Sequence, residues 1–192
     1  MKKLFFLPLL AFIAFAFTTI STYSVDTSNS EVKWTASKVT GTHTGTVKLQ
    51  SGDLQMEDGQ LVGGSFVIDM TTIDCTDLQG EWKDKLVGHL KSPDFFGVDT
   101  YPTAKFVVTR AYPTDTKGNY RVIGNITIKE TTKEIKFDAA VGELGGKPTA
   151  TAKITLDRTD FDVRYGSGSF FDDLGDKTIY DEFDLEVTLA GK

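Results

Sequence analysis

The chain has 192 residues, 40% of them hydrophobic, which is enough to bury a sizeable core in one domain. Its 27 acidic and 21 basic side chains give a net charge of −6, and such a surface repels nucleic acid and anionic lipid headgroups. Cys75 is the only cysteine, which excludes an intramolecular disulfide, and we expect it to be a small, half-buried hydrophobic side chain.

The N-terminus has the pattern of a secretory signal peptide. Residues 1–3 carry two lysines, residues 4–17 are apolar, and small polar residues follow. The apolar segment is shorter than the ~20 residues that a membrane span needs, and no later stretch approaches that length. We therefore predict a cleaved signal peptide over residues 1–24. The mature domain, residues 25–192, is expected to be periplasmic or secreted and not stably inserted in a membrane.

Most of the mature chain alternates apolar and polar residues with a period of two, which predicts strands with one buried face. The expected inward faces are Val32, Trp34 and Ala36; Phe66, Ile68 and Met70; Ala104, Phe106 and Val108; Tyr120, Val122, Gly124, Ile126 and Ile128; Ile135, Phe137, Ala139 and Val141; Ala150, Ala152, Ile154 and Leu156; and Phe183, Leu185, Val187 and Leu189. With a further strand over residues 46–50, we expect about eight antiparallel strands in sequence order.

Only residues 81–90 break this period. Trp82, Leu86, His89 and Leu90 recur at i, i+4, i+7 and i+8, as on one face of a helix, and a Ser-Pro pair ends the segment. An all-β meander with one short helix favours an eight-stranded antiparallel barrel with the helix across one end. A two-sheet sandwich is the alternative, because periodicity alone does not separate the two architectures.

The interior of an eight-stranded barrel holds either its own side chains or one small ligand. Large inward residues such as Phe66 and Phe106 alternate with small ones such as Ala104 and Ala139, which leaves room for a narrow apolar tunnel. The same mixture also fits a packed core in which small residues face large ones. Residue sizes therefore leave both interiors open.

Residues with catalytic or metal-binding potential are scarce. His43 and His89 are the only histidines, and no Cys or carboxylate stands at ligand spacing to either, so we expect no metal site. The stretch Gly166-Ser167-Gly168 does not spell the Gly-x-Ser-x-Gly elbow of serine hydrolases. We therefore expect a protein that is not an enzyme and that uses no cofactor.

Several motifs resemble those of the YceI-like family. Residues 89–96, HLKSPDFF, followed by Tyr101-Pro102 and Phe106, resemble its central motif, in which Leu-x-Ser-x-Asp-Phe-Phe leads to Tyr-Pro and a strand Phe. His43 with Gly45 resembles its His-x-Gly turn.

Downstream, residues 124–133 resemble the family's penultimate hairpin, and residues 158–161 its Arg-x-Asp-Phe-Gly element. The resemblance covers essentially the whole mature chain. Glu130 and Asp162 stand where the family usually has glycine, which affects local turn geometry more than the fold.

The resemblance implies a lipocalin-like barrel that encloses a long isoprenoid-type lipid, a polyprenyl chain or an isoprenoid quinone precursor, for periplasmic transport or storage. Some members resemble binders of fatty amides. Each CH₂ group removed from water gains ~0.8 kcal/mol, so a long chain needs a protein enclosure to cross an aqueous compartment. A homodimer is compatible with the sequence.

We expect the inward apolar residues, together with those of the helix and the central motif, to contact the lipid chain: Trp34, Phe66, Ile68, Met70, Trp82, Leu86, Phe95, Ala104, Phe106, Val108, Tyr120, Val122, Ile126, Phe137 and Ile154. Three polar residues are expected near the mouth, where they would orient a headgroup: His43, Arg158 and Asp160. A structural ion pair between Arg158 and Asp160 is an equally good interpretation. The alternative functions are a periplasmic hydrolase of lipid esters or amides and a structural barrel with a filled interior.

Overall fold

The structure is a computed structural model that describes residues 19–192. Its elements in chain order are β1 (Ile20–Ser24), β2 (Glu31–Lys38), β3 (Gly41–Glu57), β4 (Gln60–Cys75), α1 (Gly80–Lys91), β5 (Thr103–Pro113), β6 (Asn119–Ile128), β7 (Thr131–Leu144), β8 (Lys147–Asp157), the 3₁₀ helices η1 (Arg158–Phe161) and η2 (Gly175–Lys177), and β9 (Ile179–Ala190). Residues 1–18, most of the predicted signal peptide, lie outside the described residues.

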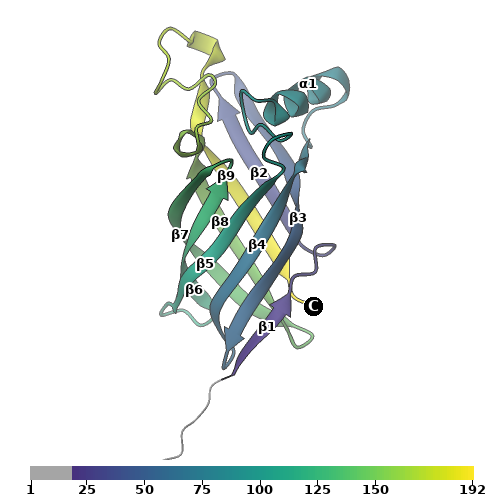
Figure 1. The fold of residues 1–192 in the computed structure, drawn as a ribbon, viewed down its shortest axis with the longest axis vertical. Coiled ribbons are helices and arrows are strands. Elements are labelled where there is room, and N and C mark those ends of the chain that lie inside the picture. Colours follow the sequence, from purple (N-terminus) through teal and green to yellow (C-terminus); the bar gives the residue numbers. More distant parts are fainter. Residues whose placement is uncertain (1–18) are drawn as a thin grey trace, which may run out of the picture.

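The strands form one closed antiparallel barrel (Figure 1). Neighbours follow the order β3-β2-β9-β8-β7-β6-β5-β4, and β4 pairs back onto β3. The pairing of β2 with β9, from Glu31 opposite Thr188 to Lys38 opposite Ile179, joins the two ends of the meander. The predicted eight-stranded barrel is therefore confirmed, and the sandwich alternative is wrong.

A ninth strand, β1, lies beside the second half of β3. It pairs with residues 53–57, beyond the segment of β3 that pairs with β2. The sequence interpretation placed residues 20–24 at the end of the signal peptide, and it limited β3 to residues 46–50. Both β1 and the longer β3 were thus missed. The length of β3 was missed because polar residues lie between its apolar ones at bulges such as the one between Leu49 and Ser51.

The predicted helix is present as α1, at the upper end of the barrel in Figure 1. It ends at Ser92, whose backbone N–H and Oγ both donate to the carbonyl oxygen of His89, at 3.1 and 2.8 Å. Leu86 and His89 face the barrel, but none of the helix residues is fully buried. No helix within residues 19–192 is both long enough and apolar enough to cross a membrane.

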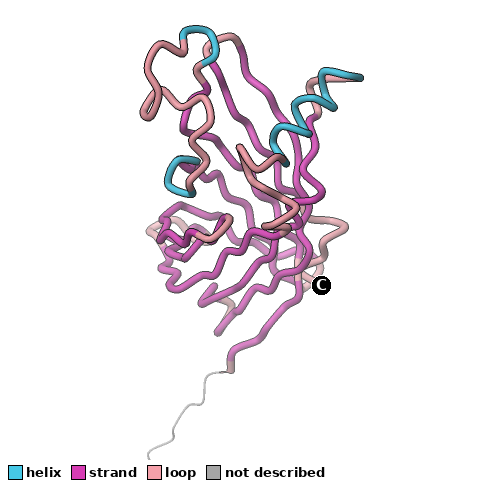
Figure 2. Tube along the Cα trace, turned by 45° about the horizontal axis from the view of Figure 1, so that its top comes forward, coloured by secondary structure: helices cyan, strands magenta, loops and turns pink. Residues whose placement is uncertain are grey.

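A long connection between β8 and β9 covers the other side of the same end (Figure 2). It begins with η1, which is capped by the Asp157 carboxylate accepting from the Thr159 backbone N–H at 2.8 Å. Asp162, where the family usually has glycine, ends η1 with a φ of 58°. Asp tolerates this left-handed conformation better than most residues, so the departure from glycine leaves the turn intact.

The core is built from the alternating apolar residues of the strands. Phe66, Phe106 and Val122 are buried, as expected from the period of two. Cys75 is fully buried rather than half-buried, and its Sγ lies 3.2 Å from Oδ1 of Asp77. Burial and this hydrogen bond raise the pKa of the Cys75 thiol, which makes it unreactive.

Candidate functional site

The barrel interior contains two adjoining apolar cavities. The upper cavity, at the α1 end, has a volume of about 250 Å³, and the lower cavity has about 110 Å³. Val32, Ile68, Ile126 and Leu185 line both cavities. These four residues come from β2, β4, β6 and β9, so they form a waist around the barrel at which the two cavities meet.

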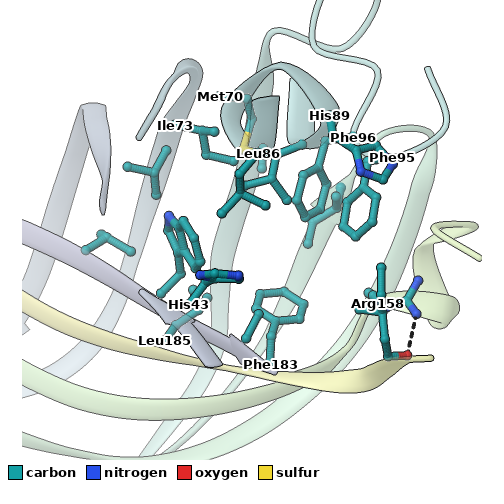
Figure 3. Close-up of a pocket in the computed structure, with 18 of the residues that line it drawn as sticks. His43, Met70, Ile73, Leu86, His89, Phe95, Phe96, Arg158, Phe183 and Leu185 are labelled. Atoms are coloured by element: carbon teal, nitrogen blue, oxygen red, sulfur yellow. Dashed lines mark hydrogen bonds between the residues drawn. The ribbon is translucent and has the colours of Figure 1, made fainter. Parts of the chain in front are cut away.

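The upper cavity lies between the strand ends, α1 and the start of β9 (Figure 3). Besides the waist, its apolar lining is Trp34, Ala36, Val47, Met70, Ile73, Leu86, Leu90, Phe95, Phe96, Ala104, Ile128, Ile179 and Phe183. The lower cavity is lined by Leu49, Leu54, Leu61, Phe66, Phe106, Val122, Ile135, Phe137, Ala139, Ala150, Ala152, Ile154, Val187 and Leu189.

Polar side chains are concentrated at the α1 end. Those lining the upper cavity are Ser37, Lys38, His43, His89, Arg158 and Tyr180. The lower cavity has Thr151 as its single polar lining residue. The interior is therefore amphipathic along its length, with a polar mouth and an apolar lower part.

His43 is a polar group at the mouth, and none of residues 19–192 makes a hydrogen bond to its Nε2. Its Nδ1 lies 2.8 Å from Oδ2 of Asp77. Burial alone would raise the pKa of Asp77, but hydrogen bonds from the Thr44 backbone N–H, His43 and Cys75 lower it to about 2. Because this carboxylate is ionised at neutral pH, Nδ1 donates to it. A neutral His43 then presents Nε2 as a hydrogen-bond acceptor.

The glycine two residues after His43 makes room for the indole of Trp34. A Cβ on Gly45 would lie 2.3 Å from Cζ2 of Trp34 and 1.9 Å from the carbonyl oxygen of Asp74. That same carbonyl accepts a hydrogen bond from Nε1 of Trp34 at 3.1 Å. The His-x-Gly motif thus places a polar residue at the mouth and an aromatic wall beside it.

Arg158 lines the upper cavity but has no free donor for a headgroup. It is 3% exposed, and its three nitrogens donate to the carbonyl oxygens of Val163, Tyr165, Ile179 and Tyr180 and to Oδ1 of Asp181 at 3.1 Å. These five contacts use all five guanidinium N–H groups. Arg158 is therefore a clamp that holds the β8–β9 connection onto β9.

Asp160 lies outside the cavity. Its carboxylate pairs with Lys133 at 2.9 Å on the surface, so the expected ion pair between Arg158 and Asp160 is not formed. Arg158 instead forms its ion pair with Asp181.

The central motif forms the roof of the upper cavity. The rings of His89 and Phe95 meet edge to face at 5.3 Å, and Phe95 meets Phe96 at 5.5 Å. The guanidinium of Arg158 lies 5.5 Å from the Phe95 ring centre, and Tyr165 contacts His89 at 4.5 Å. Two motifs far apart in the sequence therefore meet at the mouth.

All but three of the residues expected to contact a lipid chain line one of the cavities. Trp82 does not, because it lies on the first turn of α1 and is 72% exposed. Val108 and Tyr120 line neither cavity either. Val108 lies opposite Gly124, over which the Phe106 ring packs, and Tyr120 is buried opposite Ala139, toward the far end of the barrel.

Sequence reasoning missed several lining residues. Phe183 and Leu185 are on the apolar face of β9, which the alternation had identified as inward but which was not assigned to the site. His89 and Leu90 follow the helical period, and Phe96 adjoins Phe95 in the central motif. The sequence showed the patterns to which these residues belong, but not where along the barrel axis each residue lies relative to the cavity.

The described residues do not assemble a hydrolytic pair. Neither histidine is hydrogen-bonded to a Ser, Thr or Cys side chain within residues 19–192, and no group of His, Cys, Asp or Glu there could hold a metal ion. What the arrangement can do is enclose an apolar chain and meet a polar group at one end.

Comparisons with known proteins agree with this geometry. The sequence model of the family described as "YceI-like domain" matches residues 23–190. A UPF0312 protein of Pseudomonas putida is 28% identical over 153 residues, which cover 77% of this chain and 72% of the relative.

Solved structures share the fold. Burkholderia cenocepacia BcnA has a TM-score of 0.73 at 22% identity, covering 88% of this chain and 99% of its own. A polyisoprenoid binding domain from Saccharophagus degradans, implicated in plant cell wall breakdown, has a TM-score of 0.67 at 18% identity, covering 88% and 97%. The Campylobacter jejuni YceI protein has 0.53 at 19% identity, covering 69% and 74%.

Proposed function

Because the chain belongs to the YceI-like family, we propose that it binds a long isoprenoid-type lipid inside the barrel, with the lipid headgroup at the α1 end. The observation that carries this proposal is the amphipathic interior, whose polar groups lie at the mouth and whose lower part is apolar. The structural neighbour from Saccharophagus degradans, a polyisoprenoid binding domain, supports the choice of lipid.

The length of the interior limits the lipid chain. Lining residues follow β9 from Ile179 to Leu189, a strand length of roughly 33 Å at ~3.3 Å per residue. With the ~40° strand tilt of a barrel, this is about 25 Å along the axis. A saturated chain rises ~1.25 Å per carbon, given bonds of ~1.5 Å and angles of ~111°, so about 20 main-chain carbons fit when extended.

His43 is the residue best placed to orient the headgroup. Its Nδ1 is held by Asp77, and its Nε2 can accept a hydrogen bond from a hydroxyl group. Arg158 is not proposed to bind the headgroup, because its donors are fully used, and Asp160 lies outside the cavity. No cofactor is proposed besides the lipid.

The proposed setting is the periplasm, with the lipid carried or stored there. It is supported by the family and by the basic and apolar residues at the start of the sequence. N-terminal sequencing of the exported protein should find a mature start between Ser21 and Asp26. A soluble cytoplasmic protein that retains Met1 would contradict this assignment.

The binding function is tested by extracting the purified protein with organic solvent and identifying co-purified lipid by mass spectrometry. We expect a long-chain lipid with the mass spacing of isoprene units, in an amount approaching one molecule per chain. A protein expressed with its native export route that carries no lipid and takes up none from a polyprenol dispersion would contradict the proposal.

A further inference from the structure

Large apolar side chains that are exposed to solvent gather at the α1 end of the barrel. Those at this end are Val39, Trp82, Tyr165, Phe170, Phe171 and Tyr180, which we call the mouth ring. They come from the β2–β3 turn, α1, the β8–β9 connection and the start of β9. The opposite end exposes Ile20, Tyr112 and Leu144.

The mouth ring flanks the opening of the upper cavity. Figures 1 and 2 show α1 and the β8–β9 connection at the same end of the barrel, on opposite sides. Tyr180 belongs both to the ring and to the cavity lining, and Tyr165 contacts His89, which also lines the cavity. The exposed apolar surface is therefore continuous with the apolar interior.

Cations lie over two aromatic groups of the ring, Trp82 and Phe170. Nζ of Lys85 lies 5.1 Å from the Trp82 ring centre, and the guanidinium of Arg164 lies 4.6 Å from the Phe170 ring centre. Aromatic side chains beside Lys or Arg are favoured where a protein meets the headgroup region of a bilayer. A Trp or Phe side chain that is exposed only to water has no comparably favourable contact.

We propose that the mouth ring docks the barrel on the surface of a phospholipid bilayer, so that the lipid passes between the bilayer and the cavity without crossing water. This inference rests on the proposed lipid-binding function. A bilayer fits better than a protein partner, because the ring surrounds the entrance to a cavity whose own lining is apolar.

The charge of the chain decides which bilayer fits. The net charge of −6 and the acidic residues Asp172, Asp173 and Asp176 beside the ring oppose an anionic surface. Docking therefore depends on the aromatic side chains and is strongest on zwitterionic phospholipid. Six side chains at a rim give reversible contact rather than stable insertion.

Trp82 is a built-in reporter of this contact. The chain has two tryptophans, and Trp34 is 8% exposed whereas Trp82 is 72% exposed. When phosphatidylcholine vesicles are added to the purified protein, we expect Trp fluorescence to shift to shorter wavelength and iodide quenching to fall. Replacing part of the phosphatidylcholine with phosphatidylglycerol should weaken this response.

A matched pair of variants tests the role of the ring. Phe170→Ser with Phe171→Ser should lower vesicle partitioning at least tenfold, whereas Tyr112→Ser with Leu144→Ser, at the opposite end, should leave it unchanged. An equal loss in both variants, binding that requires phosphatidylglycerol, or no response to either vesicle would overturn the inference.

Lipid extraction from the same preparations separates this inference from the function on which it rests. Wild-type protein that carries lipid but ignores vesicles contradicts only the docking proposal. Protein that binds vesicles through the ring but carries and accepts no lipid contradicts the lipid-binding function and leaves the docking surface standing.

Discussion

Filling the upper cavity should abolish lipid binding without unfolding the barrel. Ala104 is the residue of choice, because it lines this cavity from β5 and is 5% exposed. Ala104→Phe adds six ring carbons that occupy space otherwise available to the lipid chain. At ~0.8 kcal/mol per carbon removed from water, displacing six chain carbons costs the complex about 5 kcal/mol. This lowers affinity about 10³- to 10⁴-fold.

The stability of the lipid-free protein should hardly change, because a cavity of about 250 Å³ can accept the ring. Forcing a side chain into a filled core instead costs ~1–3 kcal/mol, which corresponds to a fall in melting temperature of ~2–4 °C per kcal/mol in a domain of this size. We therefore expect a change under about 2 °C. Both proteins are compared after delipidation, because bound lipid would itself raise the melting temperature of the wild type.

Gly124→Ala is the contrasting control. A Cβ on Gly124 would lie 2.4 Å from Cζ of Phe106 and 2.5 Å from the carbonyl oxygen of Val107, so this position has no spare volume. One added carbon here should destabilise the barrel by ~1–3 kcal/mol, more than six carbons at Ala104. If Ala104→Phe melts as far below wild type as Gly124→Ala does, the interior is filled and the reasoning fails.

Three further predictions concern the polar residues of the mouth. Replacing both His43 and His89 by Gln should leave lipid bound at reduced affinity, as measured by co-purified lipid; loss of a measurable hydrolysis of lipid esters would favour an enzyme instead. Asp77→Asn should lower the free energy of unfolding by about 1 kcal/mol above pH 4, less than the full pKa shift implies because the side chain is partly exposed. Since the folded carboxyl has its pKa lowered to about 2, the wild type loses this advantage as pH falls from about 4 to about 2, and urea titrations across that range should show the gap closing. Arg158→Met should cost ~3–5 kcal/mol in the same assay, because four backbone carbonyl oxygens and the partly buried Asp181 carboxylate lose a buried charged donor; a loss under ~1 kcal/mol would contradict the clamp.

The strand faces and the barrel were predictable because the period of two survives along nearly every strand. Buried and more exposed residues alternate along the whole of β6 and over the first four residues of β5, and a sheet with one buried face forces that alternation. The same pattern contains most of the strand residues that line the cavities, although not all of them were assigned to the site.

The features that the sequence could not predict depend on which separate segments come close together in space, and the periodicity of one segment does not report this. Trp82 shares a helical face with Leu86, but the pattern does not show which turns of the helix lie over the barrel. Trp82 lies on a turn that does not, and it is exposed. Asp160 lies only two residues from Arg158 in sequence, whereas Asp181 becomes its partner only when the β8–β9 connection folds back. Residues 20–24 have a composition that suits a leader as well as a strand.

The pairing of β2 with β9 has a consequence for the order in which this molecule folds. Val32 meets Val187, so nearly the whole domain must be looped out before this seam can form. Closing a loop of such length costs about 4–5 kcal/mol of chain entropy, whereas the hairpins between β5 and β8 close locally. The β2–β9 pairing should therefore form last, on the millisecond-to-second timescale typical of non-local β topologies. Until then the barrel is an open, curved sheet, and a lipid present during refolding can be wrapped sideways rather than threaded through the finished mouth.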